Sequence, residues 1–157
     1  MNEHATILRT LMNEHGQLEV PSKGMSMYPF IKEGDCCVFE TMDLSLIKRG
    51  DVVLFQSRDG NLTGHRFIKS HKSSTKQWFI FKGDTNLYPD APVRESEIIG
   101  VLTSISRNNR TIRMNSPLIK AYSLSFSYLR FFSVLAHIYV NKILKKRDLA
   151  DEHSRSY

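Results

Sequence analysis

The feature that most constrains the fold is a series of short apolar or alternating segments between residues 36 and 114. They cover residues 36–40, 52–56, 62–70, 78–82, 98–106 and 111–114. Turn-forming dipeptides separate several of them, and Asp59-Gly60 and Asn108-Asn109 are both typical of tight β-hairpins. Short strands joined by such turns predict a compact, mostly antiparallel β domain.

Helical segments flank this β region. Residues 3–15 place Ile7, Leu8, Leu11 and Met12 at helical spacing, and Gly16 is a typical helix stop. Residues 17–20 predict a short strand. After Ser116-Pro117, a good helix start, residues 118–147 predict one long helix or two. The chain therefore divides into an N-terminal helix and lead-in (1–21), a β domain (22–115), a C-terminal apolar and basic helical segment (116–147) and a tail expected to be disordered (148–157).

The charge is unevenly distributed. The net charge is +6 over 157 residues, and no Asp or Glu occurs from Ile98 to Arg147. A field of one sign favours an anionic partner, either lipid head groups or nucleic acid. For residues 118–147 two interpretations stay open: a helix packed on the β domain, or an interfacial helix whose Lys145, Lys146 and Arg147 contact anionic lipid.

Nothing in the sequence predicts a cofactor or a metal. Cys36 and Cys37 are adjacent in a predicted strand, which sends their side chains to opposite faces and disfavours a bridge between them. The first residues lack the long apolar run of a signal peptide, and the longest uncharged run of the C-terminal segment, 131–141, is shorter than the ~20 residues of a spanning helix. We therefore expect a cytoplasmic protein, or one that is peripheral at the membrane.

The segment most indicative of chemistry is Gly24-Met25-Ser26-Met27-Tyr28-Pro29. A serine hydroxyl becomes a useful nucleophile only with a base in hydrogen-bond reach and a rigid mount that exposes its oxygen. A tight turn flanked by glycine and leading into a strand is such a mount. We call the segment 24–29 the knuckle. The alternative for Ser26 alone is an ordinary polar turn.

Four further blocks follow the knuckle in order: Arg49-Gly50-Asp51-Val52-Val53, Gly64-His65-Arg66-Phe67-Ile68, Lys82-Gly83-Asp84-Thr85-Asn86 with Asp90, and Ile98-Ile99-Gly100-Val101. Together with the knuckle they resemble the signal peptidase I superfamily of serine peptidases over residues 22–106. Because a histidine occupies the base position, the resemblance is to the histidine-type, endoplasmic-reticulum-like variant. It implies a compact antiparallel β domain of the signal peptidase and LexA type.

The resemblance assigns roles to individual residues. Ser26 is the implied nucleophile, His65 the general base and Asp90 the carboxylate that orients the base. His71 is a competing histidine outside the motif, interpreted as structural. Asp84 is the competing carboxylate, which we expect to cap the amides of its own turn. The supporting residues are Gly24, Met25, Met27, Pro29, Arg66 and Asp84.

One position departs from the family pattern. Many signal peptidases have Ser-Gly-Ser-Met, in which the hydroxyl two residues before the nucleophile helps hold the oxyanion. Here that position is Gly24, and Gly-Met-Ser-Met resembles LexA-type self-cleaving repressors instead. Backbone N–H groups around Ser26 are then left to stabilise the oxyanion.

The sequence therefore predicts a serine endopeptidase that cleaves a leader or precursor peptide through an acyl-enzyme. One alternative is a catalytically inactive peptide-binding module with the same fold. Another is a LexA-like regulator that cleaves itself and contacts DNA. We rank it last, and expect no nucleic-acid partner, because about 20 N-terminal residues cannot hold a helix-turn-helix domain and His65 stands where those proteins have lysine.

Overall fold

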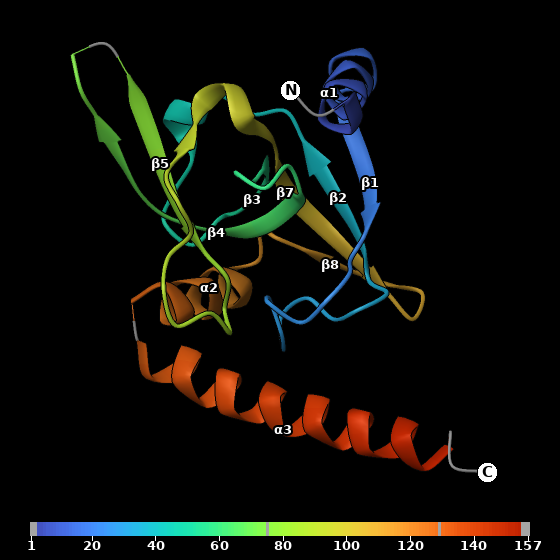
Figure 1. Ribbon diagram of the computed structural model, residues 1–157. Helices are drawn as coiled ribbons and strands as arrows, with labels where there is room; N and C mark the ends of the chain where they lie inside the picture. The colour runs from blue at the N-terminus through green and yellow to red at the C-terminus, as the bar shows by residue number, and fades with distance from the viewer. Residues whose placement is uncertain (1–2, 75, 129, 155–157) are drawn as a thin grey trace.

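The computed structural model describes residues 3–74, 76–128 and 130–154 of the chain (Figure 1). Its elements, in chain order, are α1 (Glu3–His15), β1 (Gln17–Pro21), β2 (Cys36–Glu40), the 3₁₀ turn η1 (Leu44–Leu46), β3 (Val52–Gln56), β4 (Leu62–Lys72), β5 (Gln77–Lys82), β6 (Val93–Arg94), the 3₁₀ turn η2 (Glu95–Glu97), β7 (Ile98–Arg107), β8 (Arg110–Arg113), α2 (Pro117–Tyr128) and α3 (Arg130–Ser154).

The strands form one antiparallel sheet in the order β1-β2-β7-β3-β4-β5-β6, with β8 paired to β7. β4 is shared by two neighbours: its first half pairs with β3, and its second half pairs with β5. Register shifts interrupt the β2–β7, β3–β7 and β4–β5 ladders. Bulges of this kind bend a strand and increase its twist, so the sheet curls into a half-barrel. The predicted fold class, a compact and mostly antiparallel β domain, is confirmed.

Both predicted hairpin turns are present. Asn108 and Asn109 have φ values of 49° and 59°, the left-handed pair that a two-residue turn between β7 and β8 requires. Asp59-Gly60 closes the β3–β4 hairpin, where the Ser57 N–H donates to the Asn61 carbonyl at 2.8 Å.

The sheet is buried on both faces around β3. Val52 and Leu54 point into one apolar cluster, and Val53 and Phe55 point into the other. The first cluster lies between the sheet, α1 and the knuckle, and the second is built around stacked phenylalanines from β3, β4 and β5 (Phe55, Phe67, Phe79 and Phe81). A strand covered on both sides is a rigid support for the hairpin that follows it.

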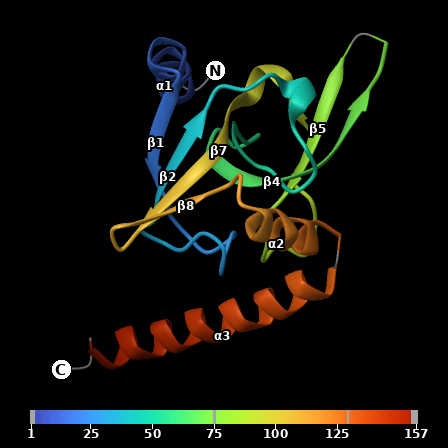
Figure 2. The ribbon, with the colours of Figure 1, turned by 180° about the vertical axis from the view of Figure 1, so that it is seen from behind.

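The C-terminal region contains two helices. Both views show α2 against the sheet and α3 as a long rod that runs past it, at the end of the molecule opposite α1 (Figures 1 and 2). α3 continues to Ser154 and so includes residues 148–154 of the tail that was expected to be disordered; residues 155–157 lie outside the described part of the chain. Extending a formed helix needs no new nucleation, and Leu149 and Ala150 are good helix formers. Within the described ranges, no helix is both long and apolar enough to cross a membrane.

Candidate active site

The mount of Ser26 is a compact turn between β1 and β2. Gly24 has a φ of +78°, which favours glycine, and the Tyr28 N–H donates to the Met25 carbonyl at 3.1 Å. Met27 is 5% exposed and anchors the turn in the first apolar cluster. Pro29 follows a cis peptide bond with Tyr28. The turn therefore holds Ser26 by residues on both sides of it.

A second segment fixes the Ser26 backbone from across the fold. The Thr85 N–H donates to the Ser26 carbonyl at 2.9 Å, and the Thr85 hydroxyl lies 3.2 Å from the same oxygen. Gly83 allows this approach, because a Cβ atom at that position would lie 2.9 Å from the Ser26 carbonyl oxygen. The Gly83–Asn86 turn is therefore packed directly on the nucleophile segment.

The structure brings together the three residues predicted to form the triad. His65 lies on β4, and its Nε2 is 2.9 Å from Ser26 Oγ. Its Nδ1 is 2.7 Å from Asp90 Oδ2. The carboxylate accepts, so we assign the proton to Nδ1, which leaves Nε2 as the acceptor for the serine hydroxyl. His65 is 6% exposed and lies edge-on to Phe55, so little water reaches the imidazole.

Asp90 reaches His65 from the loop that follows β5. The Asp90 N–H donates to the Phe81 carbonyl at 2.9 Å, so this loop folds back along its own strand. This places Asp90, and not Asp84, beside His65.

Asp84 has a different position from the one predicted. We expected it to cap the amides of its turn; instead, its carboxylate accepts two hydrogen bonds from Arg66, at 2.6 and 2.9 Å. Both side chains are buried. Burial raises the pKa of Asp84, and the adjacent Arg66 guanidinium opposes that shift. Arg66 also donates to the Gly50 carbonyl and to Ser123 Oγ of α2, at 3.0 and 2.8 Å.

Arg66 therefore connects three elements behind the site. It follows His65 directly on β4 and points to the opposite side of the strand, where it meets Asp84, α2 and the ring of Phe30 at 4.5 Å. Sequence reasoning found Arg66 and Asp84 as supporting residues but missed Thr85 and Ser123. The Lys82–Asn86 block contains Thr85, whereas no motif marks Ser123.

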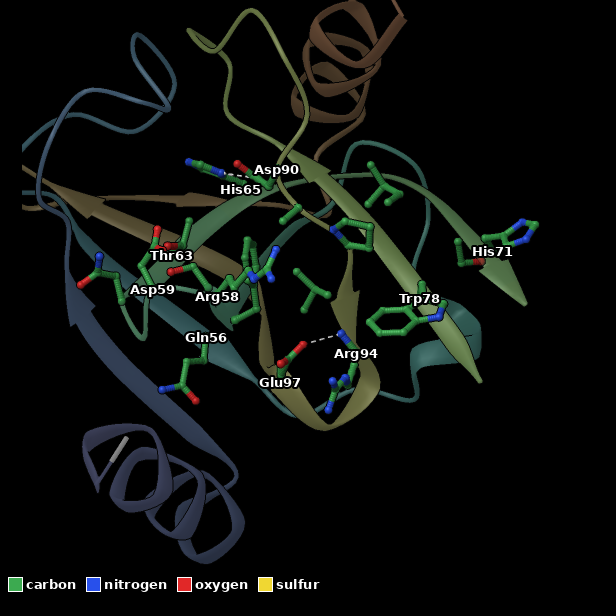
Figure 3. A pocket seen from close by; sticks show the side chains of 18 of the residues that line it. Gln56, Arg58, Asp59, Thr63, His65, His71, Trp78, Asp90, Arg94 and Glu97 are labelled. Atoms are coloured by element: carbon green, nitrogen blue, oxygen red, sulfur yellow. Dashed lines mark hydrogen bonds and ion pairs between the residues drawn. The ribbon is translucent and has the colours of Figure 1, made fainter. Parts of the chain in front are cut away.

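His71 is far from the nucleophile. It lies on the exposed second half of β4, beyond the register shift between Phe67 and Lys69. Figure 3 places it at the far end of a pocket from His65 and Asp90. It pairs in register with Trp78 of β5.

Two cavities meet at His65. The first, about 610 Å³, lies on the Ser26 side between the end of β1 and the start of β4, and its walls are largely apolar (among them Val20, Met27, Ile31, Phe39, Leu54 and Leu62). The second, about 890 Å³, lies on the Asp90 side and is more polar (Figure 3). Gly24 and Gly64 line the first cavity without a side chain, which leaves room for a chain beside Ser26. Within the described ranges, no three His, Cys, Asp or Glu side chains cluster as a metal site.

Comparison with known proteins adds one finding. No protein-family model matches the chain. A stretch of 84 residues, 53% of the chain, is 32% identical to the signal peptidase complex catalytic subunit SEC11 of Scheffersomyces stipitis. The match spans about half (49%) of that protein's length. This distant homology agrees with the predicted resemblance to signal peptidases.

Proposed function

We propose that the protein is a serine endopeptidase of the signal peptidase type. The observation that carries the proposal is the continuous hydrogen-bonded chain Ser26–His65–Asp90, with separations of 2.9 and 2.7 Å. A nucleophile, a base and an orienting carboxylate in this order are the arrangement that acyl transfer by serine requires.

The proposed reaction has two halves. Ser26 Oγ attacks the peptide carbonyl carbon while His65 Nε2 takes the hydroxyl proton, and Asp90 stabilises the imidazolium through Nδ1–H. Collapse of the tetrahedral intermediate breaks the C–N bond, and His65 returns the proton to the leaving amine. A water molecule, deprotonated by His65, then hydrolyses the Ser26 ester and frees the enzyme.

The oxyanion needs a donor near Ser26, and Gly24 supplies no hydroxyl. The Ser26 backbone N–H is the candidate, since no described residue accepts a hydrogen bond from it. Its carbonyl, by contrast, is held by Thr85. Because the Ser26 carbonyl is fixed, the backbone of this residue holds its N–H in a constant direction, which suits that N–H to stabilise developing negative charge.

The apolar cavity beside Ser26 is the proposed substrate groove. Its walls come from the end of β1 and the start of β4, so a substrate in extended form can lie between them as an added strand. The apolar lining favours small or aliphatic residues before the cleaved bond. The substrate class we propose is therefore a leader or precursor peptide.

An anionic membrane surface is the proposed second partner, which would place the protein at the membrane periphery. The outward face of α3 exposes Val134, Leu135 and Ile138. The next turns on the same face expose three lysines (Lys142, Lys145 and Lys146). An apolar stripe followed by cations is typical of an interfacial helix on anionic lipid.

The test is cleavage of a synthetic peptide library, read by mass spectrometry. Wild type should cleave it, Ser26→Ala and His65→Ala should each lose at least about 10³-fold in kcat/KM, and His71→Ala should match wild type. Equal turnover by wild type and Ser26→Ala contradicts the assigned nucleophile.

A folded wild-type protein that binds library peptides in the groove without cutting them supports the second candidate, a non-catalytic peptide-binding module. The observation that favours this candidate is the absence of a hydroxyl at Gly24.

A further inference from the structure

Helix α3 contacts the segments that hold Ser26. His137 Nδ1 lies 3.0 Å from the Thr85 carbonyl oxygen. Because a carbonyl only accepts, His137 donates from Nδ1, and Asn141 Nδ2, 3.0 Å from Nε2, donates to the other ring nitrogen. The helix therefore fixes Thr85 through its carbonyl.

Thr85 is held on its other side by the nucleophile. Its N–H donates to the Ser26 carbonyl at 2.9 Å, so a single residue connects α3 with Ser26. The resulting order of contacts is Asn141, His137, Thr85 and Ser26. The last of these contacts, from the Thr85 N–H to the Ser26 carbonyl, joins two backbone groups and does not depend on a side-chain rotamer.

Two further contacts place α3 on the same part of the fold. Ser133 is 2% exposed and accepts a hydrogen bond from Lys82 Nζ at 2.6 Å, immediately before the Gly83–Asn86 turn. Tyr139 stacks on Tyr28, two residues after Ser26, with ring centroids 5.8 Å apart and planes 19° apart. The helix thus touches the nucleophile turn and its supporting turn.

The inward face of α3 is built for this contact. Its buried positions carry small or medium side chains, Ser133, Ala136 and Val140, which let the helix approach the turns closely. Leu135 and Ile138, two larger side chains of the same helix, lie on the opposite face and are 48% and 59% exposed.

We propose that α3 is a positioning element for the serine nucleophile, and that His137 is its principal positioning residue. This inference rests on the proposed peptidase function. Holding Thr85 keeps the Ser26 carbonyl in place, and through the Ser26 backbone it maintains both the Oγ–Nε2 hydrogen bond and the direction of the Ser26 N–H. Misplacement of about 1 Å at a reacting group costs up to about 10²-fold in rate.

The test compares four variants. His137→Ala removes the donor to Thr85, and His137→Gln offers a side-chain amide that can donate in its place. Asn141→Ala removes only the outer contact, and Leu144→Ala is the matched control at an exposed apolar position of the same helix. We expect His137→Ala to lower kcat about 10- to 100-fold with little change in KM. His137→Gln should recover most of the loss, and Leu144→Ala should equal wild type.

A second readout separates this inference from the proposed function. Amide hydrogen exchange at Thr85, followed by NMR, reports the turn directly and needs no activity. It should be faster in His137→Ala than in Leu144→Ala. Slow exchange at Thr85 in both variants overturns the positioning role, as does a kcat for His137→Ala equal to that of Leu144→Ala. Absence of turnover in wild type overturns the peptidase proposal, whereas the exchange comparison still decides whether α3 holds the turn.

Discussion

The sharpest stability prediction concerns Arg66 and Asp84, the buried ion pair on the opposite side of β4 from His65. Replacing Arg66 by Met keeps much of the volume and removes the charge. Asp84 then keeps a carboxylate at 2% exposure without the guanidinium that it pairs with, and the Gly50 carbonyl and Ser123 Oγ lose their hydrogen bonds from Arg66. Breaking a buried ion pair on one side costs about 3–5 kcal/mol, because the remaining charge is uncompensated. For a chain of this length that lowers Tm by roughly 6–20 °C.

The assay is chemical denaturation of wild type, Arg66→Met, Asp84→Asn and the double variant. The double variant removes both charges and should be more stable than Arg66→Met, since an uncharged pair needs no compensation. The pH dependence has a defined sign. Burial without Arg66 raises the Asp84 pKa further, so the carboxyl takes up a proton on folding and the Arg66→Met deficit shrinks as pH falls. A loss below about 1 kcal/mol, or a double variant no better than the single one, refutes the argument.

Three further predictions follow from other contacts. Gly83→Ala places a methyl group against the Ser26 carbonyl oxygen and should lower kcat more than Tm. Gly100→Ala places a methyl group against Met12 and the Glu40 carbonyl, so it should lower Tm while kcat is retained below the melting range. Equal effects of the two substitutions on kcat and on Tm contradict the assigned geometry. Burial alone would raise the Asp35 pKa, but hydrogen bonds from Arg107 and from the Lys32 N–H bring it below its ordinary value of 3.8. The Asp35 carboxylate therefore stabilises the fold above that pH, and this stability is lost as pH falls. Asp35→Asn should show a shallower acid-unfolding limb than wild type. In vesicle co-sedimentation the protein should bind anionic lipid, and the binding should weaken as the salt concentration rises. Replacing three lysines of α3 (Lys142, Lys145 and Lys146) by glutamine should weaken it too. Protein that stays in the supernatant at low salt shows that α3 is not interfacial.

Much of the site could be predicted because its chemistry is local in sequence. Ser26, His65 and Asp90 each lie in a short block with its own turn or strand signal, and the order of the blocks resembles a known family. The same holds for the hairpins, since a residue such as Asn109 reports its left-handed backbone directly.

Other features depend on tertiary contacts that no local pattern encodes. Asp84 lies in a turn sequence that favours a cap, but the buried Arg66 competes for its carboxylate and prevails. Ser123 is 57 residues from Arg66 and lies among similar alternating serines, so nothing marks it. His137 could not be identified, because only the docking of α3 brings it to Thr85.

The central claim is that Ser26 becomes acylated with His65 as its base. The most direct measurement is intact-protein mass spectrometry after rapid acid quench of the protein with a peptide ester, followed by mapping of the modified residue. We expect a transient mass increase equal to the acyl fragment, located on Ser26, absent in Ser26→Ala and greatly slowed in His65→Ala. An adduct on another residue, or hydrolysis of the ester by Ser26→Ala at the wild-type rate, would contradict the account.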